Sequence, residues 1–81
     1  MIGKMWLRPG DRVRLRSAPA QTDLQEDTGS VVRRDEWAGY YIVRLDLPAL
    51  YHHADGREEE LQEICEAADN LEILPQPGGN L

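Results

Sequence analysis

Two stretches of the chain indicate its fold, RPGDRVRL at residues 8–15 and GSVVRRDEWAGYYIVRLD at residues 29–46. In the first, a Pro-Gly pair marks a turn, because proline presets one backbone dihedral and glycine tolerates a positive φ. Apolar and charged residues then alternate, which places Val13 and Leu15 on one face and arginines on the other. One buried and one solvated face are typical of an antiparallel strand, so we predict a strand over residues 12–16.

The second stretch predicts two more strands joined by a hairpin. Residues 30–34 restart a strand after Gly29, where we expect the sharp bend or bulge that a small barrel needs. Residues 35–39 have the length and the closing glycine of a hairpin loop. Residues 40–46 are rich in aromatic and β-branched side chains, which favour strands. Alternation along all the strands predicts one shared interior, formed by Val13, Leu15, Val31, Tyr41, Val43, Leu45 and Ile73.

Two long loops are expected, at about residues 17–28 and 47–57. The first is polar and rich in turn-forming residues, and its lone large apolar residue, Leu24, is expected to rest on the barrel. The second contains Pro48 and the turn-forming pair Asp55-Gly56. Both segments are therefore predicted to be excursions from the sheet rather than strands.

The segment at residues 58–68 fits two local structures. Its apolar residues recur at the spacing of a helix, whereas the surrounding pattern requires another strand. The helical spacing is carried by Leu61, Ile64, Cys65 and Ala68. We favour a strand, followed by a short helical turn at residues 67–70 and a closing strand at residues 71–74 that points Leu71 and Ile73 inward.

Together these elements predict one mainly β domain, a five-stranded, strongly bent barrel over residues 8–74. Residues 1–7 form a lead-in, and residues 75–81 form a Pro- and Gly-rich tail that we expect to be flexible. A chain of 81 residues buries only roughly 60–65% of its extended-chain surface, so its core is small. Substrate cavities of ~300 Å³ or more are hard to form in so short a chain, which argues against a self-contained enzyme.

Cysteine usage and hydropathy limit the compartment in which the protein works. Cys65 is the only cysteine, so no disulfide can form within the chain, and a reducing compartment is expected. The N-terminus lacks the apolar region of a secretory signal, and no apolar run approaches the ~20 residues of a membrane span. The sequence thus predicts a soluble, cytoplasmic protein without a membrane partner.

Charge is distributed unevenly along the chain. Residues 1–44 hold eight Lys/Arg against six acidic residues, a balance of +2, and residues 45–81 hold one Arg against nine acidic residues, a balance of −8. The sum is the net charge of −6. An acidic protein is repelled by nucleic acid overall, although a local basic face can still bind it. Such a bipolar surface favours association with protein partners.

Four short motifs resemble the SH3-like small-barrel superfamily. Its pattern has a Pro-Gly-Asp-led first strand, a Gly-x-Val that opens the second, a Gly-Tyr hairpin and a short helical turn before the last strand. In this chain the pieces are Gly10-Asp11-Arg12-Val13, Gly29-Ser30-Val31, Gly39-Tyr40-Tyr41-Ile42-Val43 and Asp69-Asn70-Leu71-Glu72. The resemblance covers residues 8–74 and implies a bent, five-stranded SH3-like barrel.

Subfamilies of this superfamily imply different functions. Gly29-Ser30-Val31 looks like the KOW motif of ribosomal and transcription-elongation proteins, which implies contact with RNA or polymerase. The run from Gly39 to Pro48 is similar to a CAP-Gly strand, but the Gly-Lys-Asn-Asp-Gly signature of that family is absent from the sequence. The layout also looks like the barrels of the nitrile hydratase β-subunit and the ferredoxin-docking stromal subunit of photosystem I, which are non-catalytic and are held against a larger partner. A shared fold by itself transfers none of these functions.

Few residues are of the types that bind metal or act as nucleophiles. His52, His53 and Cys65 are metal-ligand types, but structural zinc takes four ligands in recognisable pairs, which the sequence lacks. As a nucleophile, Cys65 would need a lowered pKa, whereas its acidic neighbours would raise the pKa of the thiol. The acidic run at residues 58–60 is typical of a solvated face or a protected sheet edge. We therefore expect no metal, no cofactor and no catalysis.

Two surfaces are candidates for binding. An aromatic surface at the hairpin edge and the second long loop would dock a protein partner or a larger complex, and its residues are Trp37, Tyr40 and Tyr51. An arginine-rich strand face would instead bind RNA or DNA through phosphates, and its residues are Arg12, Arg14, Arg16, Arg33, Arg34 and Arg44. Pairing of these arginines with the acidic C-terminal half would neutralise that face. The sequence favours the protein-docking module, with nucleic-acid binding as the alternative.

Overall fold

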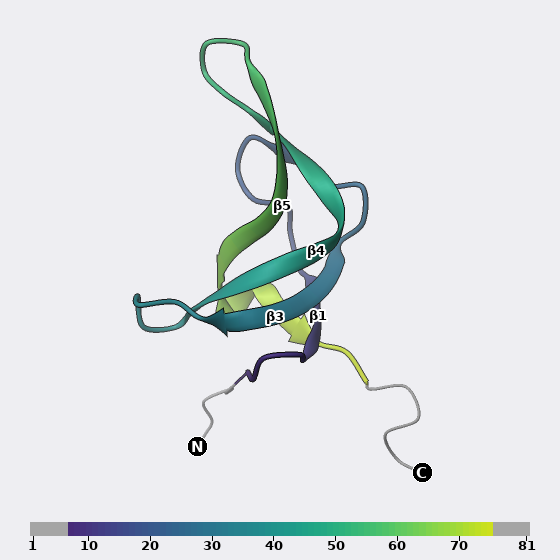
Figure 1. Cartoon of the computed structure of the whole chain (residues 1–81), viewed down its shortest axis with the longest axis vertical. Coiled ribbons are helices and arrows are strands. Elements are labelled where there is room, and N and C mark those ends of the chain that lie inside the picture. Colours follow the sequence, from purple (N-terminus) through teal and green to yellow (C-terminus); the bar gives the residue numbers. More distant parts are fainter. Residues whose placement is uncertain (1–6, 76–81) are drawn as a thin grey trace.

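The computed structural model describes residues 7–75, which form one curled, half-barrel sheet (Figure 1). The elements in chain order are β1 (Arg12–Leu15), β2 (Thr22–Asp23), β3 (Thr28–Arg34), β4 (Tyr40–His52), β5 (Glu58–Ala67), the 3₁₀ turn η1 (Ala68–Asn70) and β6 (Leu71–Ile73). The predicted mainly β, strongly bent architecture is confirmed, with the two-residue β2 as a sixth strand beyond the predicted five. Within the described residues, no helix has the length and apolarity needed to cross a membrane.

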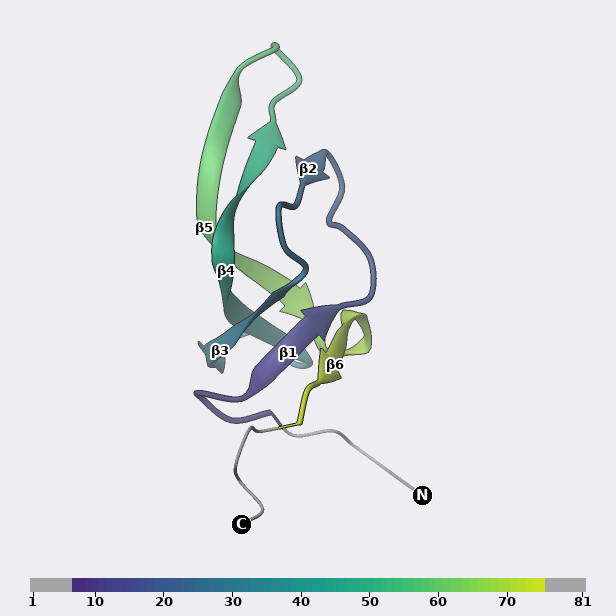
Figure 2. The same cartoon turned by 90° about the vertical axis from the view of Figure 1, so that its right-hand side faces the viewer.

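All the strand pairs are antiparallel. β1 pairs with β3 and β6, and β3 pairs in turn with β4. β5 pairs with both halves of β4, while the short β2 pairs with the far half of β4 on its other edge. The far half of the β4–β5 hairpin therefore projects beyond β1, β3 and β6, with β2 beside it (Figure 2). We call this projecting part, residues 49–61, the arm.

The core lies on one face of the curled sheet, as strand alternation predicts. Six of the seven residues predicted to share the interior are buried, namely Val13, Leu15, Val31, Tyr41, Val43 and Leu45. They form one cluster with Leu7, Ala49, Ile64 and Leu71. The prediction for Ile73 is wrong, because this residue is 46% exposed. Ile73 lies opposite Val13 in the register, but β6 is an edge strand, and β1 is its only strand partner within residues 7–75.

Gly29 is needed for close packing rather than for a bulge. Its φ is not in the left-handed region, and a Cβ atom placed on it would collide with the carbonyl oxygen of Arg44 on β4. The register shift of the β3–β4 pair falls later, between Val31 and Arg33. The predicted bend at Gly29 is therefore corrected to a bulge near Val32.

The long loop predicted at residues 47–57 is largely wrong. β4 continues to His52, β5 begins at Glu58, and only a short turn joins them. Pro48, which cannot donate a backbone hydrogen bond, lies where the β4–β5 register shifts between Arg44 and Ala49. The strand thus accommodates its proline at a place where ladder bonds are already interrupted.

Most of the predictions for the remaining segments are confirmed. Residues 58–67 form a strand rather than a helix, and the predicted helical turn is η1. The first long loop is present but contains β2, and Leu24 is half-buried against the core as predicted. The core also includes Leu7, whose N–H donates to the Tyr41 hydroxyl (3.4 Å). Apart from Leu7 and Pro75, the predicted lead-in and flexible tail lie outside the described residues.

Candidate interaction surfaces

The turn between β3 and β4 presents Trp37 and Tyr40 to solvent. The N–H of Tyr40 donates to the carbonyl of Trp37 (3.1 Å), and the N–H of Asp35 donates to the carbonyl of Tyr40 (3.0 Å). Gly39 completes the turn with a φ of 84°, a left-handed conformation that favours glycine. This hydrogen-bonded turn leaves Trp37 75% exposed and Tyr40 43% exposed.

Exposed apolar side chains are concentrated on this hairpin. Of the five large hydrophobic residues that are exposed within residues 7–75, three lie on it, and the other two are Leu47 and Ile73. Apolar residues scattered singly over a surface need no explanation, whereas three on one hairpin make it a candidate interaction surface. We call the three, Val32, Trp37 and Tyr40, the hairpin patch.

Tyr51 lies apart from the hairpin patch, near the tip of the arm. It is half-buried and contacts the ring of His53 edge-on, with centroids 4.7 Å apart and an interplanar angle of 86°. Its partner on β5 is Glu59, whereas Tyr40 pairs with Ala67 at the other end of the same two strands. Figure 1 shows the two turns at opposite ends of β4. The structure therefore brings two of the three predicted docking residues together and separates the third.

Two histidines connect the strands of the arm. His52 places Nε2 2.8 Å from Oδ2 of Asp23 on β2 and Nδ1 3.4 Å from Oε2 of Glu58 on β5. The hydrogen bond with Asp23 raises the pKa of His52, and the charges of Asp23 and Glu58 raise it further. His53 places Nε2 2.9 Å from Oε1 of Glu59. Both histidines are thus engaged with carboxylates of neighbouring strands.

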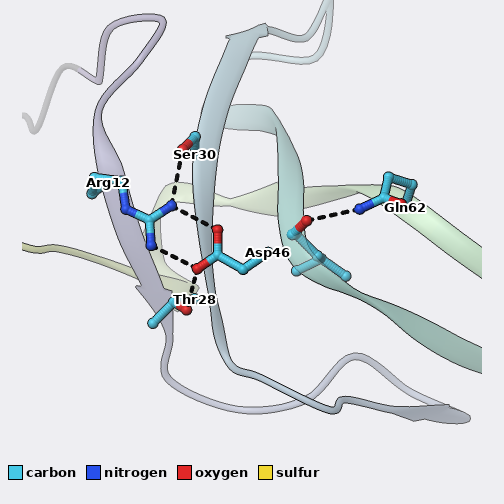
Figure 3. A network of polar contacts seen from close by, with 6 residues as sticks. Arg12, Thr28, Ser30, Asp46 and Gln62 are labelled. Atoms are coloured by element: carbon cyan, nitrogen blue, oxygen red, sulfur yellow. Dashed lines mark hydrogen bonds and ion pairs between the residues drawn. The ribbon is translucent and has the colours of Figure 1, made fainter.

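Arg12 is held in a polar network on the outer face of the sheet (Figure 3). Its guanidinium donates to both carboxylate oxygens of Asp46 (2.7 and 2.6 Å) and to Oγ of Ser30 (3.0 Å). The hydroxyl of Thr28 also donates to Asp46 (2.6 Å). The hydrogen bonds from Arg12 and Thr28 lower the pKa of Asp46 to about 2. The charge of this guanidinium is already paired with a carboxylate, which weakens its attraction for a phosphate.

Two more of the predicted nucleic-acid-binding arginines lie close to acids. Arg14 places Nε 3.6 Å from Oδ2 of Asp27, and Arg44 places Nη1 3.8 Å from Oε2 of Glu63. The register puts Arg12 opposite Ser30 and Ser30 opposite Arg44, so this outer face does gather arginines from β1 and β4. Acidic side chains alternate with them, so the face carries mixed charge.

Of the other three arginines, Arg33 shares this outer face, because it lies opposite Ile42, two residues before Arg44 on β4. Arg16 is exposed just after the end of β1. Arg33 and Arg34 are successive residues at the end of β3, opposite Ile42 and the buried Tyr41 respectively, so they belong to different faces of the sheet. The predicted set of six is therefore divided among several environments.

The remaining chemically versatile side chain is Cys65 on β5. Desolvation raises the pKa of its thiol, and the carboxylate of Asp35 raises it further. Because the thiolate is the nucleophilic and metal-binding form, this environment disfavours both roles at neutral pH. Across the described part of the chain, no group of three or more His, Cys, Asp or Glu side chains is placed to hold a metal ion.

An open hollow of about 250 Å³ lies between the first loop and the arm. Its apolar lining includes Leu24, Pro48 and Leu50, and two carboxylates, Asp23 and Glu60, also line it. Such a hollow fits a single side chain better than a substrate.

Sequence reasoning missed the polar residues that stabilise the sheet. Alternation continued beyond Leu45 would have placed Asp46 on the arginine face, so that signal was present in the sequence. No such signal exists for Gln62, which donates to the carbonyl of Leu45 (2.9 Å), or for Gln25, which donates to that of Pro48 (2.7 Å). These two bonds satisfy backbone groups at the interrupted part of the β4–β5 ladder.

Comparison with known proteins identifies no relative. No protein-family model, no curated protein and no solved structure matches this chain.

Proposed function

We propose that this protein is a non-catalytic interaction module that docks onto a protein partner or a larger complex through the hairpin patch. The observation that carries the proposal is the exposure of Trp37, 75%, on a hydrogen-bonded turn. A tryptophan side chain offers 150–250 Å² for burial, so covering Trp37 would contribute on the order of 4 kcal/mol before the costs of association. A tryptophan that can contribute this much binding free energy, and that lies on a defined turn, has the character of an interface hot spot.

The architecture and charge support the same proposal. Strand order β6-β1-β3-β4-β5, with a 3₁₀ turn before the last strand, supports assigning the chain to the SH3-like barrels, whose members include non-catalytic docking subunits. The single cysteine cannot form a disulfide within the chain, which supports a reducing compartment such as the cytoplasm. The acid partners of Arg12, Arg14 and Arg44 count against the nucleic-acid alternative.

The proposal is tested by capturing partners from an extract of the source cells with three immobilised baits. The baits are the wild type, Trp37→Ala and, as a matched surface control, Arg14→Ala. We expect the wild type and Arg14→Ala to retain the same partner at close to one-to-one stoichiometry, and Trp37→Ala to lose most of it. Equal recovery by all three baits, or no stoichiometric partner with the wild type, would contradict the proposal.

A further inference from the structure

β5 has a free edge along its length. Among residues 7–75, β4 is its only strand partner, and β5 extends for ten residues from the tip of the arm to the hairpin patch. A strand edge of this kind presents backbone donors and acceptors that can pair with an added strand. In Figure 2, β5 forms the outer margin of the arm.

The ladder pattern identifies the backbone groups that point outward. The N–H of Ala68 donates to the carbonyl of Gly39, and the N–H of His53 donates to that of Arg57. In an antiparallel pair, hydrogen-bonded and non-hydrogen-bonded positions alternate, so the register fixes all the others. The residues whose N–H and C=O point away from β4 are Glu58, Glu60, Glu63, Cys65 and Ala67.

Charge restricts what can pair with this edge. Five of the ten residues of β5 are glutamates and none is basic. Over residues 40–67, two arginines stand against seven acidic residues, a net charge of −5. A second copy of β5 would bring glutamates against glutamates, and like charges opposite each other destabilise a strand pair. An extended segment rich in lysine and arginine would instead place opposite charges in the cross-strand rows.

The hollow beside the arm is lined by side chains that lie opposite one another on three neighbouring strands. Asp23 pairs with Leu50, and Leu50 pairs with Glu60, so all three side chains lie on the same face. Both carboxylates and Leu50 line the hollow. A residue of an added strand opposite Glu60 would lie next in this row, where a long side chain with a cationic end meets both the apolar lining and a carboxylate.

We propose that the free edge of β5 is a strand-addition site for an extended, Lys/Arg-rich segment of a partner protein. This inference rests on the proposed docking function and deepens it. The added strand runs from Glu59, beside Tyr51, to Ala67, beside Tyr40, and so joins the two aromatic ends that the structure separates.

The probe is a fluorescein-labelled peptide of alternating lysine and valine, as long as β5, titrated with the full chain. A glutamate–valine peptide of the same length is the charge control. Glu60→Pro removes an outward N–H without touching the β4–β5 ladder, because proline is tolerated where the N–H faces solvent. Glu60→Ala removes the same carboxylate but keeps the N–H. We expect the basic peptide to bind the wild type, and to bind Glu60→Pro about tenfold more weakly than Glu60→Ala.

A second measurement does not depend on the folding of the proline variant. Amide hydrogen exchange of the wild type with the basic peptide should show new protection at the outward Glu58, Glu60 and Glu63 and no change at Glu59. Equal binding of the two peptides, equal affinity of the two variants, or unchanged exchange at the outward amides would overturn the inference. Formation of a wild-type dimer that Glu60→Pro abolishes would also overturn it, because the occupant would then be a second copy.

Failure of this inference is distinguishable from failure of the proposed function. If Trp37→Ala still loses the captured partner while Glu60→Pro retains it, docking through the hairpin patch stands and strand addition to β5 is wrong.

Discussion

Gly29 sits where two backbones approach too closely for any side chain. Substitution by alanine would drive its Cβ into the carbonyl oxygen of Arg44, and a backbone atom cannot rotate away. We expect Gly29→Ala to lower the free energy of unfolding by about 2 kcal/mol or more. Gly10→Ala is the comparison, because the Cβ there meets open space and only the φ of 93° is unfavourable, at a cost of about 1 kcal/mol. Urea unfolding of both variants checks which loses more free energy of unfolding. Similar losses would show that the close approach of β4 to Gly29 does not determine the cost of a side chain there.

The contact of Arg12 with Asp46 gives a pH-dependent contribution to stability. Because the folded protein lowers the pKa of Asp46 from 3.8 to about 2, the stabilisation is present above pH 3.8 and is lost as the pH falls toward 2. Both side chains are about one-third exposed, so solvent screening limits the contribution to about 1 kcal/mol. We expect Asp46→Asn to be less stable than the wild type at neutral pH and equal to it near pH 2, by urea unfolding. A constant difference across this range would contradict the assignment.

The environments of some individual residues could be predicted from the sequence, and those of others could not. The exposure of Trp37 could be predicted because it follows from a local turn signal. The pairing of Arg12 with Asp46 could not, because the contact spans residues on β1 and β4 and depends on the strand register. From the sequence, pairing of the arginine face with acids of the C-terminal half is therefore one alternative, and the individual partners cannot be identified.

At the level of elements, His52 links β2, β4 and β5. Its pKa is raised, so its stabilising contacts with Asp23 and Glu58 are fully present below the ordinary histidine value of 6.5 and weaken as the pH rises through the raised value. We expect the loss of stability caused by His52→Gln to be larger at a pH of about 5.5 than at about 8.5. Thermal unfolding of the wild type and the variant at both pH values measures this loss of stability. An NMR titration of the His52 ring checks the direction of the pKa shift. A histidine that titrates at or below 6.5 would refute this linkage.

The strands show why some elements were predicted and others were not. Strict alternation identified β1 and the first half of β4, since each has one buried face. The second half of β4 was missed because Pro48 normally ends a strand, and the glutamine side chains that satisfy the interrupted ladder come from distant segments. β5 could be read as a helix or a strand from its own residues, and pairing with β4 determines the outcome.

For the whole molecule, the distribution of charge predicts weak contact with nucleic acid. The net charge is −6, and three of the six candidate arginines contact carboxylates. We expect the purified protein to cause no mobility shift of mixed RNA and DNA even at low salt, where phosphate contacts are strongest. A shift that weakens steeply as salt rises, and that Arg14→Ala reduces, would show that the arginine face binds phosphate after all.

The most direct measurement of the central claim is the affinity of the captured partner for the wild type, Trp37→Ala and Arg14→Ala, each at about 50 and about 300 mM salt. Docking anchored by Trp37 predicts that Trp37→Ala weakens binding about 30-fold or more. It also predicts that Arg14→Ala changes binding less than about threefold at both salt concentrations. The opposite order of the two variants, with an Arg14→Ala effect that shrinks at the higher salt, would contradict the claim that the hairpin patch is the docking surface.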